Sequence, residues 1–247
     1  MTYFGLPYIH AVFDVAAWLA SMATFWLTTR HLLPADVLPA DKVPHPGAYA
    51  VAAGAGALCG AMFFGTANAL LSGVHALGFS MVGGIAGAIA SVEAFKRIVG
   101  VSQSTGIAFA APFAATVAVG RLGCFFSGLA DFTYGTPTSL PWGVDFGDGM
   151  PRHPTQVYDM LFALLAGFLL WRWRGALARS PGLAFKLYLA SYLAWRLLVD
   201  GIKPVPYAYA FGLSGIQWVC VLALACYLPF VCRQLSDFNH DRRLRTT

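Results

Sequence analysis

Residues 47–72 read GAYAVAAGAGALCGAMFFGTANALLS, and no charged side chain interrupts this run. A helix needs about 20 apolar residues to cross the hydrocarbon core of a bilayer. This run is longer than that, so it predicts a transmembrane helix. The same pattern recurs along the rest of the chain.

Six further apolar runs lie near residues 8–28, 79–98, 106–126, 157–173, 182–202 and 211–232. Apolar residues make up 58% of the 247 residues and charged residues only 11%, whereas an ordinary soluble domain carries about 25% charged residues. The segments between the runs are too short for a soluble domain. The sequence therefore predicts an all-α polytopic membrane protein of about seven transmembrane helices, forming one domain over residues 1–247. A long extracytoplasmic loop is expected between the fourth and fifth helices.

The lysines and arginines predict the orientation of the chain. With the N-terminus outside and the C-terminus cytoplasmic, all but four of the 16 Lys and Arg lie on or near the cytoplasmic side, as the positive-inside rule requires. These residues are Arg30, Lys42, Lys96, Arg97, Arg172, Arg174, Arg179, Lys186, Arg233, Arg242, Arg243 and Arg245. They account for the net charge of +5, so no nucleic-acid partner is predicted. Arg121, Arg152, Arg196 and Lys203 lie toward the outer half instead.

The five cysteines are Cys59, Cys124, Cys220, Cys226 and Cys232, and none has CxxC spacing. They lie inside or at the ends of the apolar runs, so we interpret them as small core residues. The sequence predicts no metal site, no disulfide framework and no cofactor.

Arg196 lies in LASYLAWRLLVDGIKP, residues 189–204. Tyr192, Arg196 and Asp200 are spaced four residues apart and Lys203 follows, which puts a polar stripe on one helical face. A charge at the centre of a spanning helix costs about 2.5–3.5 kcal/mol, so such groups usually pair or face a wet cavity. Two interpretations stay open. Arg196 and Asp200 form an internal ion pair, or Asp200 orients Arg196 toward a lipid phosphate or other anion.

His10 and Asp14 in YIHAVFDVAAW, residues 8–18, form a second polar pair four residues apart. At that spacing the carboxylate can fix the tautomer of the imidazole. The alternative is that both are headgroup-level residues without a chemical role.

Two glycine patterns, GAGALCG at 54–60 and GGIAGA at 83–88, favour close helix packing. A second possibility is that Gly83 and Gly84 leave room for a lipid headgroup.

Residues 120–159 read GRLGCFFSGLADFTYGTPTSLPWGVDFGDGMPRHPTQVYD. The density of Gly and Pro prescribes turns, which predicts a long ordered loop. Arg121 and Arg152 can hold a phosphate through their forked N–H donors. Hydrogen bonds or proton transfer can come from His153, Thr155, Gln156 and Tyr158.

In combination, these motifs resemble the signature of the bacterial prolipoprotein diacylglyceryl transferase family. Gly120-Arg121-Leu122-Gly123, Pro141-Trp142 and the RHPTQVYD of residues 152–159 are similar to that family's GRxG, PW and RHPxQLYE. FSMVGGIAG resembles its MSFHGGLxG segment, and Tyr192, Arg196, Asp200 and Lys203 match a Y-xxx-R pair followed by an acid and a base. Seven helices with the N-terminus outside also agree with the family.

The resemblance implies transfer of a diacylglyceryl group from phosphatidylglycerol to the lipobox cysteine thiol of a prolipoprotein. The reaction takes place at the outer side of the bacterial cytoplasmic (inner) membrane and releases glycerol phosphate. Arg121 and Arg196 would bind the phosphate and stabilise the leaving group. The residues predicted to contact substrates are Tyr192, Arg152, His153, Gln156, Tyr158, Asp200, Lys203, Asp131, Asp14, Gly83 and Gly84. The predicted partners are phosphatidylglycerol, a prolipoprotein or another thiol or hydroxyl acceptor, and membrane lipids.

Three positions depart from the family pattern. Val82 stands where the family has a histidine, and Cys124 stands where it has an asparagine. Leu129 stands where it has a glutamate, with Asp131 two residues later. These departures leave two alternatives open, a phospholipid-dependent transferase with a different acceptor and a non-catalytic lipid-binding or lipid-translocating relative.

The departure at Val82 removes the family's candidate base. A thiol of ordinary pKa, about 8.5, needs a base or a positive field to attack at neutral pH. His10, His75 and His153 stay open as replacements. His10, beside Asp14, and His75 are preferred as catalytic residues because His153 lies in the RHP turn.

Overall fold

The computed structural model of the chain describes residues 9–32, 46–71, 73, 75, 77–102, 104–180, 182–204 and 208–244. Its α-helices are α1 (Ile9–Leu27), α2 (Pro46–Leu71), α3 (Met81–Ile98), α4 (Ile107–Ser127), α5 (Thr155–Arg172), α6 (Arg174–Leu177), α7 (Leu183–Val199) and α8 (Gly215–Leu244). Shorter helical turns are η1 (Thr28–Leu32), η3 (Gly128–Asp131), η4 (Asp200–Ile202) and η5 (Ala210–Gly212). Every predicted apolar run contains one long helix. Lys42 and Arg245, which the sequence assigned to the cytoplasmic side, lie outside the described residues.

Four helices of the described chain are long and apolar enough to cross a membrane. The spans are Ile9–Arg30, Gly47–Leu71, Ile107–Asp131 and Gly215–His240, on α1, α2, α4 and α8. The helices α3, α5 and α7 have 17 or 18 residues each. The protein is thus a mostly helical, polytopic membrane protein.

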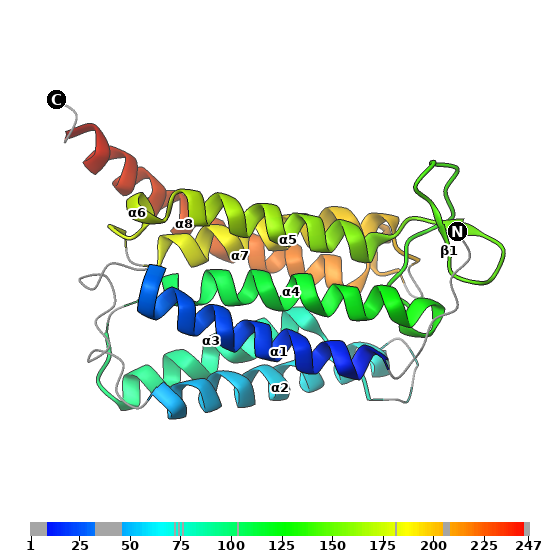
Figure 1. Cartoon of the computed structure of the whole chain (residues 1–247), viewed down its shortest axis with the longest axis horizontal. Coiled ribbons are helices and arrows are strands. Elements are labelled where there is room, and N and C mark those ends of the chain that lie inside the picture. The colour runs from blue at the N-terminus through cyan, green and yellow to red at the C-terminus, as the bar shows by residue number, and fades with distance from the viewer. Residues whose placement is uncertain are drawn as a thin grey trace.

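The long helices lie side by side along the longest axis of the molecule (Figure 1). The loop that contains strand β1 lies at one end of this bundle, and α6 lies at the other end together with the last turns of α8 (Figure 1). The predicted run ended at residue 232, but α8 continues to Leu244. A hydropathy pattern marks where an apolar surface ends, and a helix can continue beyond that point with polar side chains.

The centre of the bundle is α4, which packs against α1, α5 and α7. Just over half of the α4 span is buried within the protein, compared with 6% of the α2 span. One buried cluster joins Ala114, Val117 and Ala118 of α4 to Ala163 of α5 and to Tyr188 and Tyr192 of α7. Small side chains on α4 let its neighbours approach closely, which is how helices associate where lipid removes the hydrophobic drive.

Glycines allow the backbones of α2 and α3 to pack closely against each other. A Cβ atom added to Gly56 would lie 2.5 Å from the carbonyl oxygen of Gly87, and one added to Gly83 would lie 2.6 Å from that of Gly60. A Cβ at Gly84 would lie 3.3 Å from the carbonyl oxygen of Ala57. The packing interpretation of the glycine patterns is therefore confirmed, and Gly83 and Gly84 both face α2.

The loop between α4 and α5 is folded against the bundle. Strands β1 (Val144–Asp145) and β2 (Pro151–Arg152) pair in antiparallel register, with Val144 opposite Arg152. The Asp145 carboxylate accepts hydrogen bonds from the backbone N–H groups of Gly147 and Gly149 and shapes the turn between the strands. The backbone N–H of Thr136 donates to the carbonyl of Ile202, which joins the loop to the end of α7.

Candidate active site

Three cations from different parts of the chain meet at one carboxylate, Asp159 on α5. Its Oδ2 lies 2.9 Å from Nε of Arg121 on α4 and 3.2 Å from Nη1 of Arg196 on α7. The same oxygen lies 3.5 Å from Nζ of Lys203, which follows η4. The other oxygen, Oδ1, accepts a hydrogen bond from the indole Nε1 of Trp195 at 2.8 Å. Asp159 is therefore the common centre of this cationic cluster.

A second carboxylate, Asp200, orients Arg196. Nη2 of Arg196 donates to Oδ1 of Asp200 at 2.5 Å, and the hydroxyl of Ser214 donates to Oδ2. Lys203 Nζ lies 3.9 Å from Oδ1. The guanidinium of Arg196 is thus held between two carboxylates, and the internal ion pair of Arg196 with Asp200 is present. That Asp200 orients Arg196 toward a phosphate stays a prediction.

The cluster is buried. Arg121 and Arg196 are 6% and 5% exposed, and Asp159 is completely buried. Buried charges are tolerated when they are paired and hydrogen-bonded. Here three cations face two carboxylates, so one positive charge is in excess.

Lys203 lies just outside the predicted sixth span. Burial lowers the pKa of Lys203 to about 8, and repulsion by Arg196 and Arg121 acts in the same direction. Attraction by Asp159 and Asp200 opposes the shift. Lys203 is therefore the cation of this cluster whose charge changes near neutral pH.

Two further predicted substrate contacts lie in the buried surroundings of the cluster. Tyr192 is fully buried and its hydroxyl donates to the sulfur of Met81. Gln156 is on the same turn of α5 as Asp159 and is also fully buried. Neither polar atom of its amide has a hydrogen-bond partner within the part of the chain that the structure describes. Buried polar groups are nearly always paired, so the amide of Gln156 is an exception close to Asp159 in the chain.

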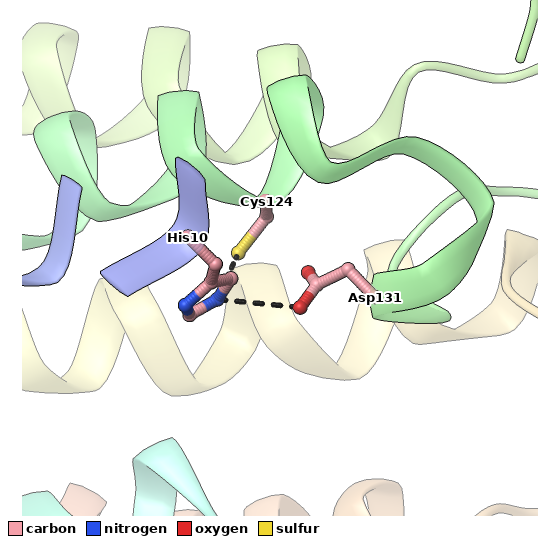
Figure 2. Close-up of side chains that lie close together, drawn as sticks. All are labelled: His10, Cys124 and Asp131. Carbon is pink, nitrogen blue, oxygen red and sulfur yellow. Dashed lines mark hydrogen bonds and ion pairs between the residues drawn. The ribbon is translucent and has the colours of Figure 1, made fainter. Parts of the chain in front are cut away.

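A second cluster lies beside the first and joins α1 to the end of α4. His10 Nδ1 is 2.8 Å from Oδ2 of Asp14, as the sequence spacing suggested. On the other side of the ring, Nε2 lies 3.2 Å from Oδ1 of Asp131 and 3.6 Å from Sγ of Cys124 (Figure 2). The two clusters meet at Arg121, whose Nη1 donates to the Cys124 sulfur at 3.7 Å.

Local backbone geometry explains why Asp131 faces His10. Gly128 ends α4 with a φ of 65°, a conformation that favours glycine. The chain then turns through η3, which ends at Asp131 (Figure 2). Among the described residues, His10, Cys124 and Asp131 form the one group of three potential metal ligands whose side-chain atoms lie within 4.8 Å of one another.

The other predicted loop residues form a separate group of contacts. Arg152 pairs with Asp148 and its guanidinium lies over the ring of Tyr134, 4.9 Å from the centroid. The hydroxyl of Tyr158 lies 3.2 Å from Nδ1 of His153 and accepts from the indole of Trp142. These interactions hold the loop together at the end of the bundle.

His75, the other preferred base, and Val82, at the position of the family's histidine, have different environments. His75 is exposed, and it has no hydrogen bond or ion pair with another residue of the described chain. Val82, where the family has histidine, is packed in an apolar cluster with Leu189, Leu193 and Cys220. Of the two preferred replacement bases, the structure therefore brings His10, and not His75, next to the arginine cluster.

A sequence profile described as prolipoprotein diacylglyceryl transferase matches residues 4–233. The chain belongs to this family. It is 36% identical over 154 residues to the phosphatidylglycerol–prolipoprotein diacylglyceryl transferase of Bordetella parapertussis, a match that covers 58% of this chain and 56% of that protein. A protein of the same name from Bordetella avium is 38% identical over 150 residues, covering 58% and 55%. The one from Rhodospirillum rubrum is 33% identical over 181 residues, covering 68% and 61%. The chain thus spans little more than half the length of these relatives.

Sequence reasoning did not select two residues that are central in this member of the prolipoprotein diacylglyceryl transferase family. Asp159 is the last residue of the RHPTQVYD motif, at the position of the acid that ends the family's RHPxQLYE. This match could have identified Asp159 from the sequence, but it did not indicate a contact with Arg121 and Arg196. Cys124 was noted as a departure from the family, and only the fold brings it next to His10.

Proposed function

We propose that this protein transfers a diacylglyceryl group from phosphatidylglycerol to a thiol, the lipobox cysteine of a prolipoprotein. The reaction takes place at the outer side of the bacterial cytoplasmic membrane. All seven long helices cross the membrane, with the N-terminus outside and the C-terminus in the cytoplasm. Membership of the transferase family supports this proposal, and so do the names of the relatives.

The observation that carries the proposal is the convergence of Arg121, Arg196 and Lys203 on Asp159. The excess positive charge suits the single negative charge of a phosphodiester. Arginines bind such oxygens through two parallel N–H donors. The unpaired amide of Gln156 adds a neutral donor and acceptor on the same face of α5.

The same charges suit the bond that breaks. Attack of the thiol sulfur on the terminal glycerol carbon forms a C–S bond, and the bond from that carbon to the phosphate oxygen breaks. Glycerol phosphate leaves as a monoester with a second negative charge. Preorganised cations stabilise the charge that develops in the transition state, where they act in a site shielded from water.

The acceptor thiol belongs on the His10 side of the site. His10, Asp14, Cys124 and Asp131 lie next to the cationic cluster through Arg121, so a thiol there is close to the phosphate ester. The proton of the thiol has to leave before sulfur attacks. This cluster holds groups that can take it.

The reaction is tested with purified protein, phosphatidylglycerol labelled in its diacylglyceryl part, and a lipobox peptide. We expect labelled peptide and an equal amount of glycerol phosphate. Arg174→Ala is a matched control because Arg174 is the first residue of α6, at the opposite end of the bundle, and it should leave the rate unchanged. Bound phosphatidylglycerol without release of glycerol phosphate would contradict the transferase and indicate the lipid-binding alternative. Release of glycerol phosphate without labelled peptide would point to a different acceptor.

The kcat/KM for phosphatidylglycerol should depend on pH through the protonation of Lys203. As pH rises through about 8, Lys203 loses its proton, and the cluster loses its excess positive charge. We therefore expect kcat/KM for phosphatidylglycerol to fall above pH 8, because this constant reports the free enzyme.

Lys203→Arg separates this effect from titration of the acceptor thiol, because arginine keeps its charge up to pH 12 or so. The ratio of kcat/KM between the parent protein and Lys203→Arg should fall by several-fold from pH 7 to pH 9. A ratio that stays constant over this range would mean that the charge of Lys203 is not used to bind the phospholipid.

A further inference from the structure

Binding of the phosphate does not explain why a thiol, an imidazole and a carboxylate approach one another at the end of α4. His10, Cys124 and Asp131 each offer one metal-binding atom, and these three atoms lie within 4.8 Å of one another (Figure 2). They come from α1, α4 and η3. Two of them, Cys124 and Asp131, are at or next to positions where the chain departs from its family pattern.

We infer that His10, Cys124 and Asp131 bind a zinc ion whose fourth position receives the thiol of the acceptor. Zinc binds sulfur at about 2.3 Å and imidazole nitrogen or carboxylate oxygen at about 2.0–2.2 Å, in tetrahedral geometry. Neighbouring ligand atoms are then roughly 3.3–3.6 Å apart. The imidazole Nε2 lies 3.6 Å from the Cys124 sulfur and 3.2 Å from Oδ1 of Asp131. These two separations are close to the edges of a zinc site, and the third pair of atoms lies within 4.8 Å.

Each of the three ligands has an outer hydrogen-bond partner, as ligands of metal sites usually do. Asp14 is bonded to the imidazole nitrogen that does not face the site, at 2.8 Å. Thr133 donates to Oδ2 of Asp131 at 2.8 Å and leaves Oδ1 directed at His10. Nη1 of Arg121 donates to the Cys124 sulfur at 3.7 Å.

The donor set selects the type of metal. A thiolate and an imidazole favour zinc and similar transition metals over magnesium and calcium, which prefer oxygen ligands only. Three protein ligands with one open position characterise catalytic zinc sites, whereas structural sites are closed by four.

The role of the metal toward the acceptor rests on the proposed function. A thiol that coordinates zinc is deprotonated outright, so R–SH binds as R–S⁻ and its proton passes to solvent. The sulfur then attacks the glycerol carbon and forms the C–S bond, and the C–O bond to phosphate breaks. No electron is gained or lost, and the thioether product is a weaker ligand that leaves. In this arrangement His10 is a ligand, and the metal does what a base would do at the position of Val82.

The inference is tested on the full chain, purified in detergent without a histidine tag, with Zn²⁺ or Co²⁺ as the probe. We expect one zinc per chain by elemental analysis, and a thiolate-to-cobalt charge-transfer band with Co²⁺. His10→Ala and Cys124→Ala should weaken zinc binding by at least about 100-fold, and Asp14→Asn by about 10- to 100-fold. Asp14 is exposed, so its variant tests the site even where a buried change prevents folding. The matched controls Cys226→Ala and His240→Ala change exposed residues of α8 and should bind zinc normally.

Addition of the lipobox peptide should change the cobalt spectrum, and the same peptide with serine in place of cysteine should not change it. Zinc binding equal to the parent in Cys124→Ala overturns the inference, as does full transfer by protein that a chelator has freed of metal. In that second case the proposed transferase still stands, with His10 as its base. Zinc binding without any lipidated peptide supports the metal site and contradicts the transferase.

Discussion

Arg196→Lys should lower the rate of diacylglyceryl transfer by about 10²–10³, nearly as much as Arg196→Ala. The guanidinium of Arg196 uses one nitrogen for Asp159 and another for Asp200. A lysine ammonium is a single point charge and cannot bridge both carboxylates in the plane of the fork. The variant keeps the charge of the site but loses the geometry that directs it to the phosphate.

The measurement is glycerol phosphate release at saturating phosphatidylglycerol, with gel filtration to establish that each variant is folded. Lysine is the more informative replacement, because alanine also removes the positive charge beside two buried carboxylates. Arg174→Lys provides the matched control at the opposite end of the bundle. Full activity of Arg196→Lys would show that only the positive charge matters, and the bidentate role of Arg196 would be wrong.

The sequence predicted the helices well because the membrane imposes a simple rule on each of them. A run such as residues 47–72 has to satisfy its backbone polar groups internally, so length and hydropathy suffice to identify a helix. The prediction failed at the end of α8, where the helix continues as a polar segment to Leu244. It also gave no account of the β1–β2 hairpin, because strands of two residues are too short to leave a periodic pattern.

The candidate site was predictable only where its contacts are local. Spacings of four residues identified the pairs of His10 with Asp14 and of Arg196 with Asp200, and both contacts are present. Asp159 contacts residues on two other helices, and no spacing along one helix carries that information. The pairing of His10 with Cys124 spans 114 positions, so reading the cysteines by their spacing alone predicted no metal site.

The charges that the sequence predicts on the outer half show the same limit of prediction. Positive-inside counting showed that Arg121, Arg196 and Lys203 needed another explanation, and the family resemblance suggested a phosphate. Neither argument revealed that the three cations share the carboxylate of Asp159. That arrangement gives Asp159 a role in stability that can be tested separately from activity.

Asp159→Ala should destabilise the protein by about 3–5 kcal/mol, the usual cost of removing one partner of a buried ion pair. Its carboxylate is fully buried and faces three cations, so its loss leaves a larger uncompensated positive charge. Asp159→Asn keeps the shape and an oxygen for the indole of Trp195, and therefore isolates the effect of the charge. Trp195→Phe removes that hydrogen bond, which is worth about 1.5–3 kcal/mol because the acceptor is charged, and it keeps an aromatic ring beside Phe162.

Denaturant unfolding in detergent measures these differences, with Asp237→Ala, at an exposed position of α8, as the control. Added glycerol phosphate gives the decisive comparison. If phosphate and the Asp159 carboxylate both neutralise the same cations, glycerol phosphate should stabilise Asp159→Ala more than the parent protein. When glycerol phosphate is present at 100 times its dissociation constant, the free energy of unfolding rises by about 2.7 kcal/mol. Equal stabilisation of both proteins would mean that phosphate binds away from Asp159. Arg121, Arg196 and Lys203 would then form a structural ion cluster, and the phosphate site of the transferase would have to lie elsewhere.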